Sequence, residues 1–482
     1  MKFVLWDTRR NDAQKDFAGG MGVGLHPGTG GIRGKILRQL FLQDRRPPAL
    51  AFAYLAAILK RLGHQVQYCL DETPPAADVY IFHPALTTLA YERQVVQRLH
   101  QQHPNAPVLI TGPVAWALPE FWSDLDVTVV RGEVEQLNTR LDSVLESDQP
   151  IVEIGSVADL DTLPIPDWSV FDYARFRIKY DFWRFPTAFI QQSRGCTFTC
   201  NYCPYIMVEN KTRFRSPDAV VDEIRFGAQR YGFRSFKFRD PLFGLNRKRA
   251  LEVAEGIGKL KQRIQFSIET RIDLVRPETL ECLAEAGLTA ITVGIETPDE
   301  ATLKRYQRAP IRDDRQRAFI EQCRRLGIRT VAGFMIGFPH DTEASILRVL
   351  DYARQLNPTY ANFNIVTPYP GTPFFDEVRD QIQHFDFDQY TVYRPVMKYV
   401  NLTSAEVAAL HGRCFGKYYF RSRYFQANAR ELWPWVNRFW PRPSSTELSP
   451  SANPNRPPRR IVKNNDSRSH ELPIVPSSKR AA

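Results

Sequence analysis

Long apolar runs are missing from this 482-residue chain: none approaches the roughly twenty residues that a membrane-spanning helix needs. Residues 1–7 become acidic too soon for a signal peptide, so we expect a cytoplasmic protein. Cysteine is scarce as well, with seven in total, an odd number. Four of the seven are scattered, which argues against a disulfide framework. These four are Cys69, Cys282, Cys323 and Cys414.

Two further motifs are absent. The glycine-rich stretch 19–35 fails as a phosphate-binding loop, because Thr29 replaces its first glycine and Ile36 its Ser or Thr. Its glycines either let a long loop approach a bulky ligand or belong to a simple flexible loop. The net charge of +11 is spread over the chain without a compact basic stripe interleaved with aromatic residues, so no nucleic-acid partner is expected.

The three remaining cysteines lie close together. Residues 194–204 read RGCTFTCNYCP, which brings Cys196, Cys200 and Cys203 onto one short loop. Three thiolates leave one iron of a [4Fe–4S] cluster without a protein ligand, and an open iron can bind a substrate. A structural zinc site would need a fourth ligand, and the candidates lie far along the chain. The spacing favours an open iron–sulfur site; a non-catalytic zinc- or nucleic-acid-binding protein is the alternative.

This C-x3-C-x2-C run, with Tyr202 before the third cysteine, resembles the signature of the radical S-adenosylmethionine (SAM) enzymes. The resemblance covers about residues 184–380. It implies that SAM binds the open iron and is cleaved to a radical that abstracts hydrogen from a substrate. It also implies an electron donor such as flavodoxin or ferredoxin, and a contact between Tyr202 and the cofactor.

Repeated strand-then-helix units after the loop predict a partial (β/α)6 barrel. The expected strands are 235–240, 265–271, 289–296, 329–337 and 361–366, with helices at 217–230 and 247–261.

Polar residues at the carboxyl ends of barrel strands commonly build active sites. By resemblance, Glu296 contacts the SAM ribose, and Glu269 and Arg271 face the ribose and the carboxylate. Asp240 lies on the strand where many members of the family carry a Gly-Gly-Glu stretch that holds the methionine amine, which this chain lacks. The alternatives are a helix cap for each carboxylate and a structural ion pair for Arg271. No catalytic residue is assigned.

Residues 1–150 also alternate strands and helices, which predicts a doubly wound, Rossmann-like sheet. The stretch PPALAFAYLA at 47–56 resembles the first helix of the cobalamin-binding domain fused to many radical SAM proteins. RGEVE at 131–135 resembles a loop of the same domain and implies cofactor contacts for Gly132 and Glu133. The histidine motif of classical cobalamin domains, Asp-x-His-x-x-Gly, is absent. Many cobalamin-dependent relatives also lack it, and a vestigial or structural domain is the alternative.

The predicted strands of this half are 2–6, 64–70, 77–82, 106–110 and 126–130, and its first helix is 49–62. We expect a cobalamin-binding-type domain at 1–150, a linker at 151–183 and a barrel at 184–385. A small helical cap follows at 386–441, with helix 404–418 over the barrel mouth, and a disordered tail at 442–482. Tryptophans beside basic residues at 432–440 favour either a membrane interface or a packed helix end.

Taken together, these features predict a radical SAM enzyme with a [4Fe–4S] cluster, SAM and cobalamin. The expected reaction is methylation of an unactivated carbon of a small-molecule or lipid-like substrate, such as a polycyclic lipid or tetrapyrrole. One SAM would supply the radical and another would remethylate cobalamin. A ring-forming or rearranging radical enzyme of the same architecture is the alternative. A methylthiotransferase is disfavoured, because a second cluster needs cysteines in the first half and only Cys69 lies there.

Overall fold

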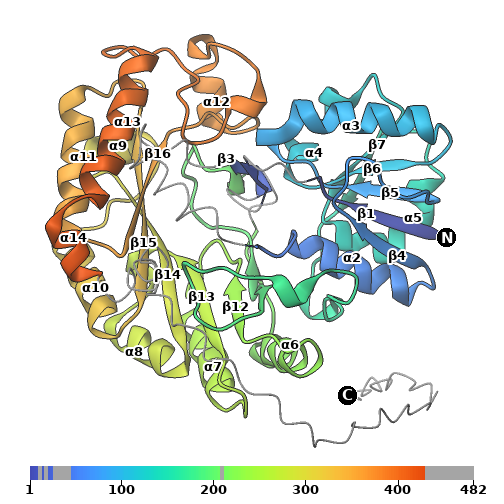
Figure 1. Ribbon diagram of the computed structural model, residues 1–482, viewed down its shortest axis with the longest axis horizontal. Coiled ribbons are helices and arrows are strands. Elements are labelled where there is room, and N and C mark those ends of the chain that lie inside the picture. The colour runs from blue at the N-terminus through green and yellow to red at the C-terminus, as the bar shows by residue number, and fades with distance from the viewer. Residues whose placement is uncertain (9–12, 16–19, 25–44, 207–210, 429–482) are drawn as a thin grey trace, which may run out of the picture. The chain divides into compact units, whose positions relative to one another are not determined.

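The computed structural model describes residues 1–8, 13–15, 20–24, 45–206 and 211–428. Residues 1–428 form one compact unit. Within it, two parallel six-stranded sheets follow each other along the chain, and each carries helices of its own (Figure 1). The expected tail at 442–482 and the tryptophan segment at 432–440 lie outside the described residues.

The first sheet is doubly wound, as predicted. Its strand order is β4-β1-β5-β6-β7-β8, so the order of the strands reverses beside β1. The strands are β1 (Lys2–Trp6), β4 (Gln65–Cys69), β5 (Val79–Phe82), β6 (Val108–Ile110), β7 (Thr128–Gly132) and β8 (Ile151–Gly155). The helices are α2 (Leu50–Arg61), α3 (Leu89–Gln102), α4 (Pro113–Ala117) and α5 (Leu137–Leu145), and a short hairpin pairs β2 (Ala13–Gln14) with β3 (Val23–Gly24).

The second sheet runs in plain succession, β16-β15-β14-β13-β12-β9, and confirms the partial (β/α)6 barrel. The strands are β9 (Thr187–Ile190), β12 (Ser235–Phe238), β13 (Gln265–Thr270), β14 (Leu288–Glu296), β15 (Arg329–Ile336) and β16 (Tyr360–Ile365). The helices are α6 (Pro217–Arg230), α7 (Arg247–Gly258), α8 (Pro277–Ala286), α9 (Glu300–Arg305), α10 (Asp313–Arg325), α11 (Glu343–Leu356), α12 (Pro373–Glu377), α13 (Ser404–Tyr419) and α14 (Ser422–Ala427).

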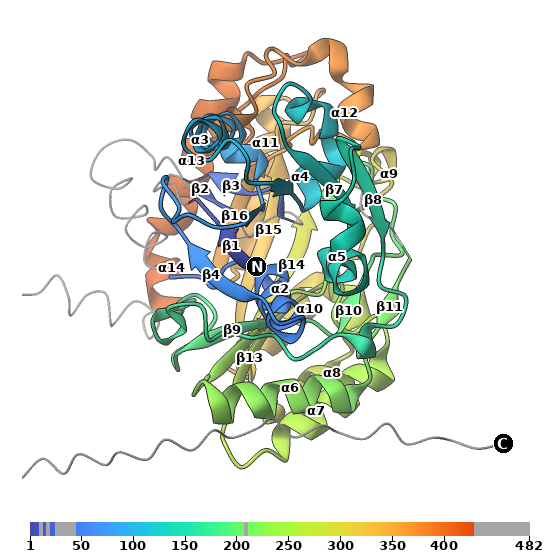
Figure 2. The same ribbon diagram turned by 90° about the vertical axis from the view of Figure 1, so that its right-hand side faces the viewer.

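Local chemistry explains these elements. Helix α6 begins where the Ser216 side chain accepts from the backbone N–H of Ala219 and Pro217 takes the first helical position. Its buried residues recur at helical spacing, so one face covers the sheet. Helices α6, α7 and α8 lie in a row on the outside of the barrel (Figure 2). The strands beneath are buried on both faces, which is the pattern of parallel sheets covered by helices.

One expected domain boundary is corrected. Strand β8 (Ile151–Gly155) pairs with β7, so the N-terminal domain extends past residue 150 into the segment expected to be linker. The strand was missed because most of its residues are partly or fully exposed, as is usual at a sheet edge.

Helix α13 is also not a lid over the barrel mouth. It packs against α11 and β16 in the outer layer, where Phe415 contacts Phe363 and the hydroxyl of Tyr419 donates to the carbonyl of Ala361. Its aromatic residues are therefore core. Among the described residues, no helix is long and apolar enough to cross a membrane.

Candidate functional site

The cysteine loop is closed at its base by two short antiparallel strands, β10 (Ser193–Arg194) and β11 (Arg213–Phe214). We call residues 193–206 and 211–214 the cluster ribbon. Gly195 begins the loop with a φ of +84°, and a Cβ there would lie 2.4 Å from the carbonyl oxygen of Lys211. Only glycine fits this close crossing. The far side of the loop is held by the backbone of Asn201. Its N–H donates to the carbonyl of Tyr306 (3.3 Å), and its carbonyl accepts from the backbone N–H of Phe374 (3.1 Å).

The three thiols of the loop are largely removed from water and form no disulfide. Burial raises the pKa of the Cys203 thiol to about 12, with further contributions from the nearby Cys200 and Cys196. Hydrogen bonds from the backbone at Phe198 and Tyr205 favour the thiolates. Among the described residues, no three His, Cys, Asp or Glu side chains converge on a point that could hold one metal ion. Cysteines that each bind a different iron of a cube need not converge in this way.

Two guanidinium groups lie beside the cysteine loop. Arg271 follows β13, is almost fully buried, and its guanidinium carbon lies 4.3 Å from the ring centroid of Phe198. It also forms two hydrogen bonds to the carboxylate of Asp273, at 2.9 and 2.8 Å. The predicted structural ion pair of Arg271 is therefore present, while its Nη1 is buried without a hydrogen-bond partner among the described residues.

Arg308 is the second guanidinium and follows α9. Its Nη1 lies 4.0 Å from the Cys200 sulfur, and its Nη2 lies 3.2 Å from a carboxylate oxygen of Glu296. Burial opposes the charge of Arg308, but Glu296, Tyr202 and Cys200 together outweigh it and raise the pKa of Arg308. Arg308 thus joins a cluster-loop sulfur to the carboxylate at the end of β14.

Glu296 lies at the carboxyl end of β14, as predicted, with an unusual backbone. Its φ is +67°, and the pairing of β14 with β15 shifts register just before it. A left-handed non-glycine residue costs of order 1–3 kcal/mol and is often found at functional sites. Burial raises the pKa of this carboxyl group, although Arg308 and Arg271 act in the opposite direction.

The other two predicted carboxylates have protein partners. Glu269 pairs with Arg239 at 2.6 Å and with Lys237 at 3.3 Å. Asp240 is fully buried and accepts from the hydroxyl of Ser193 (2.5 Å) and the backbone N–H of Gln192 (3.1 Å). Asp240 thus holds the start of the cluster ribbon.

Tyr202 lies between the second and third cysteines, with its ring edge toward Phe338 at 6.4 Å between centroids. Its buried hydroxyl has no hydrogen-bond partner among the described residues. Burial raises its pKa well above the usual value, so the phenol stays neutral.

The two predicted cofactor residues of the N-terminal domain lie at the carboxyl end of β7, where Gly132 is the last residue of the strand and Glu133 follows it. Gly132 has a φ of +144°, and a Cβ there would lie 2.6 Å from the carbonyl oxygen of Gly155. Glu133 pairs with Arg194 (3.2 Å) and Arg213 (2.7 Å), at the base of the cluster ribbon. Its carboxylate therefore reaches the barrel domain.

The barrel sheet, the cysteine loop and the polar strand ends together match a known family. Residues 190–353 match the model of the radical SAM superfamily. These residues are a radical SAM domain. The match decides against the alternative of a non-catalytic zinc- or nucleic-acid-binding protein.

The relatives of this radical SAM protein span both domains. A protein of Pyrococcus horikoshii named an uncharacterized methyltransferase is 24% identical over 413 residues, 78% of this chain and 88% of that protein. The anaerobic magnesium-protoporphyrin IX monomethyl ester cyclase of Cereibacter sphaeroides is 27% identical over 437 residues, 81% of this chain and 68% of the cyclase. Of the solved structures, the cobalamin-dependent SAM radical enzyme OxsB has a TM-score of 0.63 at 14% identity, covering 91% of this chain and 70% of its own. This last likeness concerns the fold.

The residues present fit the cofactors that the domain implies. Cys196, Cys200 and Cys203 would hold three irons of a [4Fe–4S] cluster, and the nearby cations Arg271 and Arg308 suit a site rich in thiolates. When bound, such a cluster would supply the electron that the reductive cleavage of SAM requires.

Four polar residues of this region were missed at the sequence level. Arg308 follows a short helix and no spacing rule marks it. Arg194 and Arg213 flank the cysteine loop, and Glu135 belongs to the RGEVE stretch. For Arg194, Arg213 and Glu135, their proximity to the cysteine and RGEVE motifs was the signal that could have found them.

Proposed function

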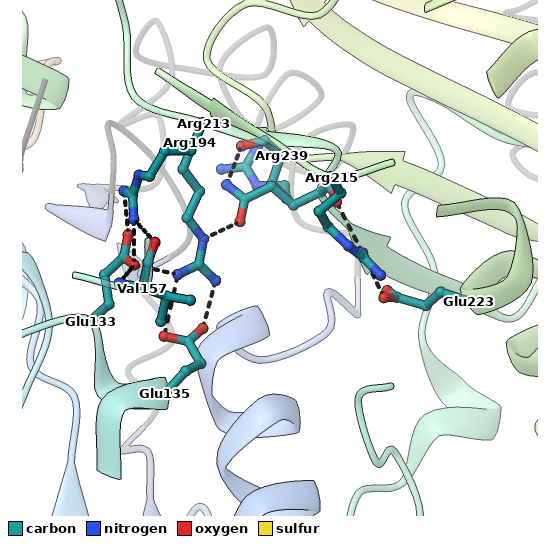
Figure 3. Close-up of polar contacts among 9 residues, drawn as sticks. Glu133, Glu135, Val157, Arg194, Arg213, Arg215, Glu223 and Arg239 are labelled. Carbon is teal, nitrogen blue, oxygen red and sulfur yellow. Dashed lines mark hydrogen bonds and ion pairs between the residues drawn. The ribbon is translucent and has the colours of Figure 1, made fainter. Parts of the chain in front are cut away.

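We propose that this protein is a radical SAM methyltransferase that carries cobalamin on its N-terminal domain. The substrate would be an unactivated carbon of a lipid-like or tetrapyrrole molecule. The observation that carries the proposal is the meeting of two strand-end edges. Glu135, after β7 of the first sheet, binds Arg194 at the base of the cluster ribbon, which follows β9 of the second (Figure 3). Both edges are where parallel α/β sheets bind ligands.

A second contact supports the same arrangement. The backbone N–H of Ala90, which follows β5 at the start of α3, donates to the carboxylate of Asp388 at 2.9 Å. The segments that follow β5 and β7 thus both contact parts of the chain beyond the N-terminal domain. A group held at that edge would therefore lie close to the radical SAM site.

The N-terminal edge holds two uncharged polar side chains, Thr87 and His83, beside a group of charges in which Lys15 pairs with Asp7 and Glu92. The strand order reverses between β4, β1 and β5, and the crevice beside such a reversal is a usual ligand site. Thr87, just after β5, is buried and its hydroxyl has no hydrogen-bond partner among the described residues. Burial lowers the pKa of His83 to about 4, so its imidazole is neutral at pH 7. We propose that Thr87 and His83 face the cofactor, which when bound supplies a transferable methyl group.

The proposal is tested on the full chain, purified and reconstituted without oxygen. With SAM, hydroxocobalamin and dithionite, a methyltransferase of this type should release both 5′-deoxyadenosine and S-adenosylhomocysteine. A bound corrinoid absorbance should survive gel filtration. Absence of the corrinoid and of S-adenosylhomocysteine would overturn the methyltransferase proposal.

The likeness to the anaerobic cyclase favours a second candidate, a ring-forming radical enzyme acting on a tetrapyrrole. It would release 5′-deoxyadenosine without S-adenosylhomocysteine. Magnesium-protoporphyrin IX monomethyl ester and a pentacyclic triterpene, each with deuteromethyl-SAM, separate the two candidates. Methylation adds a deuterated methyl group to the product mass, while cyclisation does not. We propose flavodoxin or ferredoxin as the electron donor in either case.

A further inference from the structure

The cluster ribbon presents two like charges side by side. Arg194 and Arg213 are directly opposite each other in the pairing of β10 with β11. Like charges in opposite positions of a strand pair destabilise it. The ribbon therefore needs anions from elsewhere, and they come from the N-terminal domain (Figure 3).

Two carboxylates of the N-terminal domain bind this arginine pair. Arg194 contacts Glu135 through Nη2 at 2.6 Å and Nη1 at 3.3 Å, and Glu133 at 3.2 Å. Arg213 binds both oxygens of Glu133, at 2.7 and 2.9 Å, and donates to the carbonyl of Val157. We call Glu133, Glu135, Arg194 and Arg213 the interdomain clamp. It joins the loop after β7 to both ends of the cysteine loop.

The clamp is buried. The exposed fractions of its side chains are 13% for Arg194, 8% for Arg213, 9% for Glu133 and 3% for Glu135. Burial alone would raise the pKa of Glu133, but the hydrogen bond from Arg213 and the charge of Arg194 lower it overall. Loss of one partner from a buried charge pair leaves the other uncompensated, which is far more costly than the loss of an exposed pair.

Both sides of the clamp are anchored. The backbone N–H of Glu133 donates to the carbonyl of Gly155 at 2.9 Å, and its carboxylate accepts from the N–H of Val157 at 2.7 Å. On the other side, the close crossing at Gly195 fixes the cysteine loop to its ribbon. A shift of the acidic loop would therefore be transmitted to the loop that holds the cysteines.

We propose that Glu133 and Glu135 are positioning residues for the cluster: acting through Arg194 and Arg213, they fix the cysteine loop relative to the N-terminal domain. This inference rests on the proposed function, in which a group carried on that domain must meet the radical site. Glu133 then serves the interface between the domains, in place of the cofactor contact implied by the sequence.

The test compares the full-length double variant Glu133→Gln/Glu135→Gln with wild type and with a matched control. The control is Glu153→Gln, which removes a more exposed ion pair with Arg131 inside the N-terminal domain, with exposed fractions of 29% and 56%. Amide hydrogen exchange of residues 193–206 and 211–214 should accelerate by about tenfold or more in the double variant and stay unchanged in the control. The single variant Glu135→Gln provides a milder change if the double variant folds poorly.

The reconstituted proteins give the second readout. The double variant should keep its iron and still release 5′-deoxyadenosine, while its ratio of S-adenosylhomocysteine to 5′-deoxyadenosine falls. When SAM is added, the electron paramagnetic resonance signal of the reduced cluster should change differently in the double variant and in wild type. Wild-type exchange rates and a wild-type ratio in the double variant would overturn the inference. Failure of the wild type itself to bind corrinoid or release S-adenosylhomocysteine would instead overturn the proposed function. The two failures can be distinguished, because hydrogen exchange of the cofactor-free chain tests the clamp independently of any reaction.

Discussion

The chain contains two parallel sheets of six strands each, and their strand orders differ. In the barrel the strands follow in succession from β9 to β16, so each strand end lies beside the next one along the chain. In the N-terminal sheet the order reverses beside β1, which separates the loops that leave neighbouring strands. The first arrangement gathers side chains from successive strands, and the second opens a crevice for a ligand.

The strand-end residues reflect this difference. The barrel edge is rich in charge: Glu269 pairs with Arg239, and Glu296 pairs with Arg308 beside a cysteine sulfur.

At the N-terminal edge, Asp7 follows β1 and pairs with Lys15, which also pairs with Glu92. Lys15 donates to the carbonyl of His83, whose imidazole burial keeps neutral. Strand β7 ends at Gly132, and the Glu133 that follows it pairs with Arg213. The two edges thus differ in where their charges lie: the barrel edge places Arg308 beside a cysteine sulfur, whereas Lys15 pairs with Asp7 and Glu92 within the N-terminal domain. Four expected outcomes test or refine this contrast.

The largest effect is expected at the cysteine loop. Cys196→Ala removes one of three thiolates, so iron content and 5′-deoxyadenosine formation should fall to background in anaerobic preparations. Cys282→Ala is the matched control, because Cys282 is exposed on α8, away from the loop. Iron content and SAM cleavage at wild-type levels in Cys196→Ala would contradict the assignment of the cysteine loop as a cluster site.

Arg308→Gln should have the next largest effect. The change leaves the buried Glu296 without its cation, and breaking a buried pair costs about 3–5 kcal/mol of unfolding free energy. Urea unfolding of the cofactor-free chain measures this cost. Arg312→Gln, which removes an exposed pair with Asp314, should leave the unfolding curve unchanged. Equal curves for all three proteins would show that charge pairing does not stabilise this edge.

Much of this architecture follows from sequence patterns. Strand β1 and helix α6 have the predicted bounds, because their apolar spacing and the Ser216–Pro217 start are local signals. Strand β8 was missed, because an edge strand buries few side chains. The cysteine loop was recognised from its spacing alone.

The polar partners were harder to predict. Glu133 was identified from its loop motif, but its binding to Arg213 depends on how two separately predicted domains dock. Asp240 was placed correctly at a strand end, while its hydrogen bond to Ser193 depends on the path of the chain between them. Local patterns specify elements, and contacts between residues far apart in sequence require the fold.

A pair of glycines tests whether the N-terminal edge is held rigidly. Gly132 and Gly155 are register partners on β7 and β8. A Cβ on Gly132 would lie 2.5 Å from Ile154, whereas a Cβ on Gly155, where φ is +72°, would meet nothing within 4 Å. Gly155→Ala should therefore lower the unfolding free energy by about 1–2 kcal/mol, which is the cost of placing alanine in a left-handed backbone conformation. Gly132→Ala should cost roughly 2 kcal/mol more, because it adds a steric overlap. Equal unfolding free energies of the two variants in urea would mean that the loop after β7 relaxes to accommodate the added methyl group.

The smallest expected effect is a pH dependence at the barrel edge. Burial raises the pKa of Asp240 to about 7, although hydrogen bonds from Ser193 and Gln192 act against the rise. Because the folded pKa exceeds the ordinary value of 3.8, the folded state binds more protons between these pH values. The stability that this group contributes is complete below pH 3.8 and is lost as pH rises through about 7.

Asp240→Asn should remove that pH dependence, because an amide is neutral at every pH and can donate to Ser193 while it accepts from Gln192. The stability of the variant relative to wild type should increase by roughly 2–3 kcal/mol from pH 5 to pH 8. Urea unfolding across this pH range measures the difference, with the exposed Asp222→Asn as the control. A constant difference between Asp240→Asn and wild type would contradict the raised pKa. The predicted slope would show that burial favours the neutral form of Asp240 at the barrel edge, as it favours the neutral imidazole of His83 at the other.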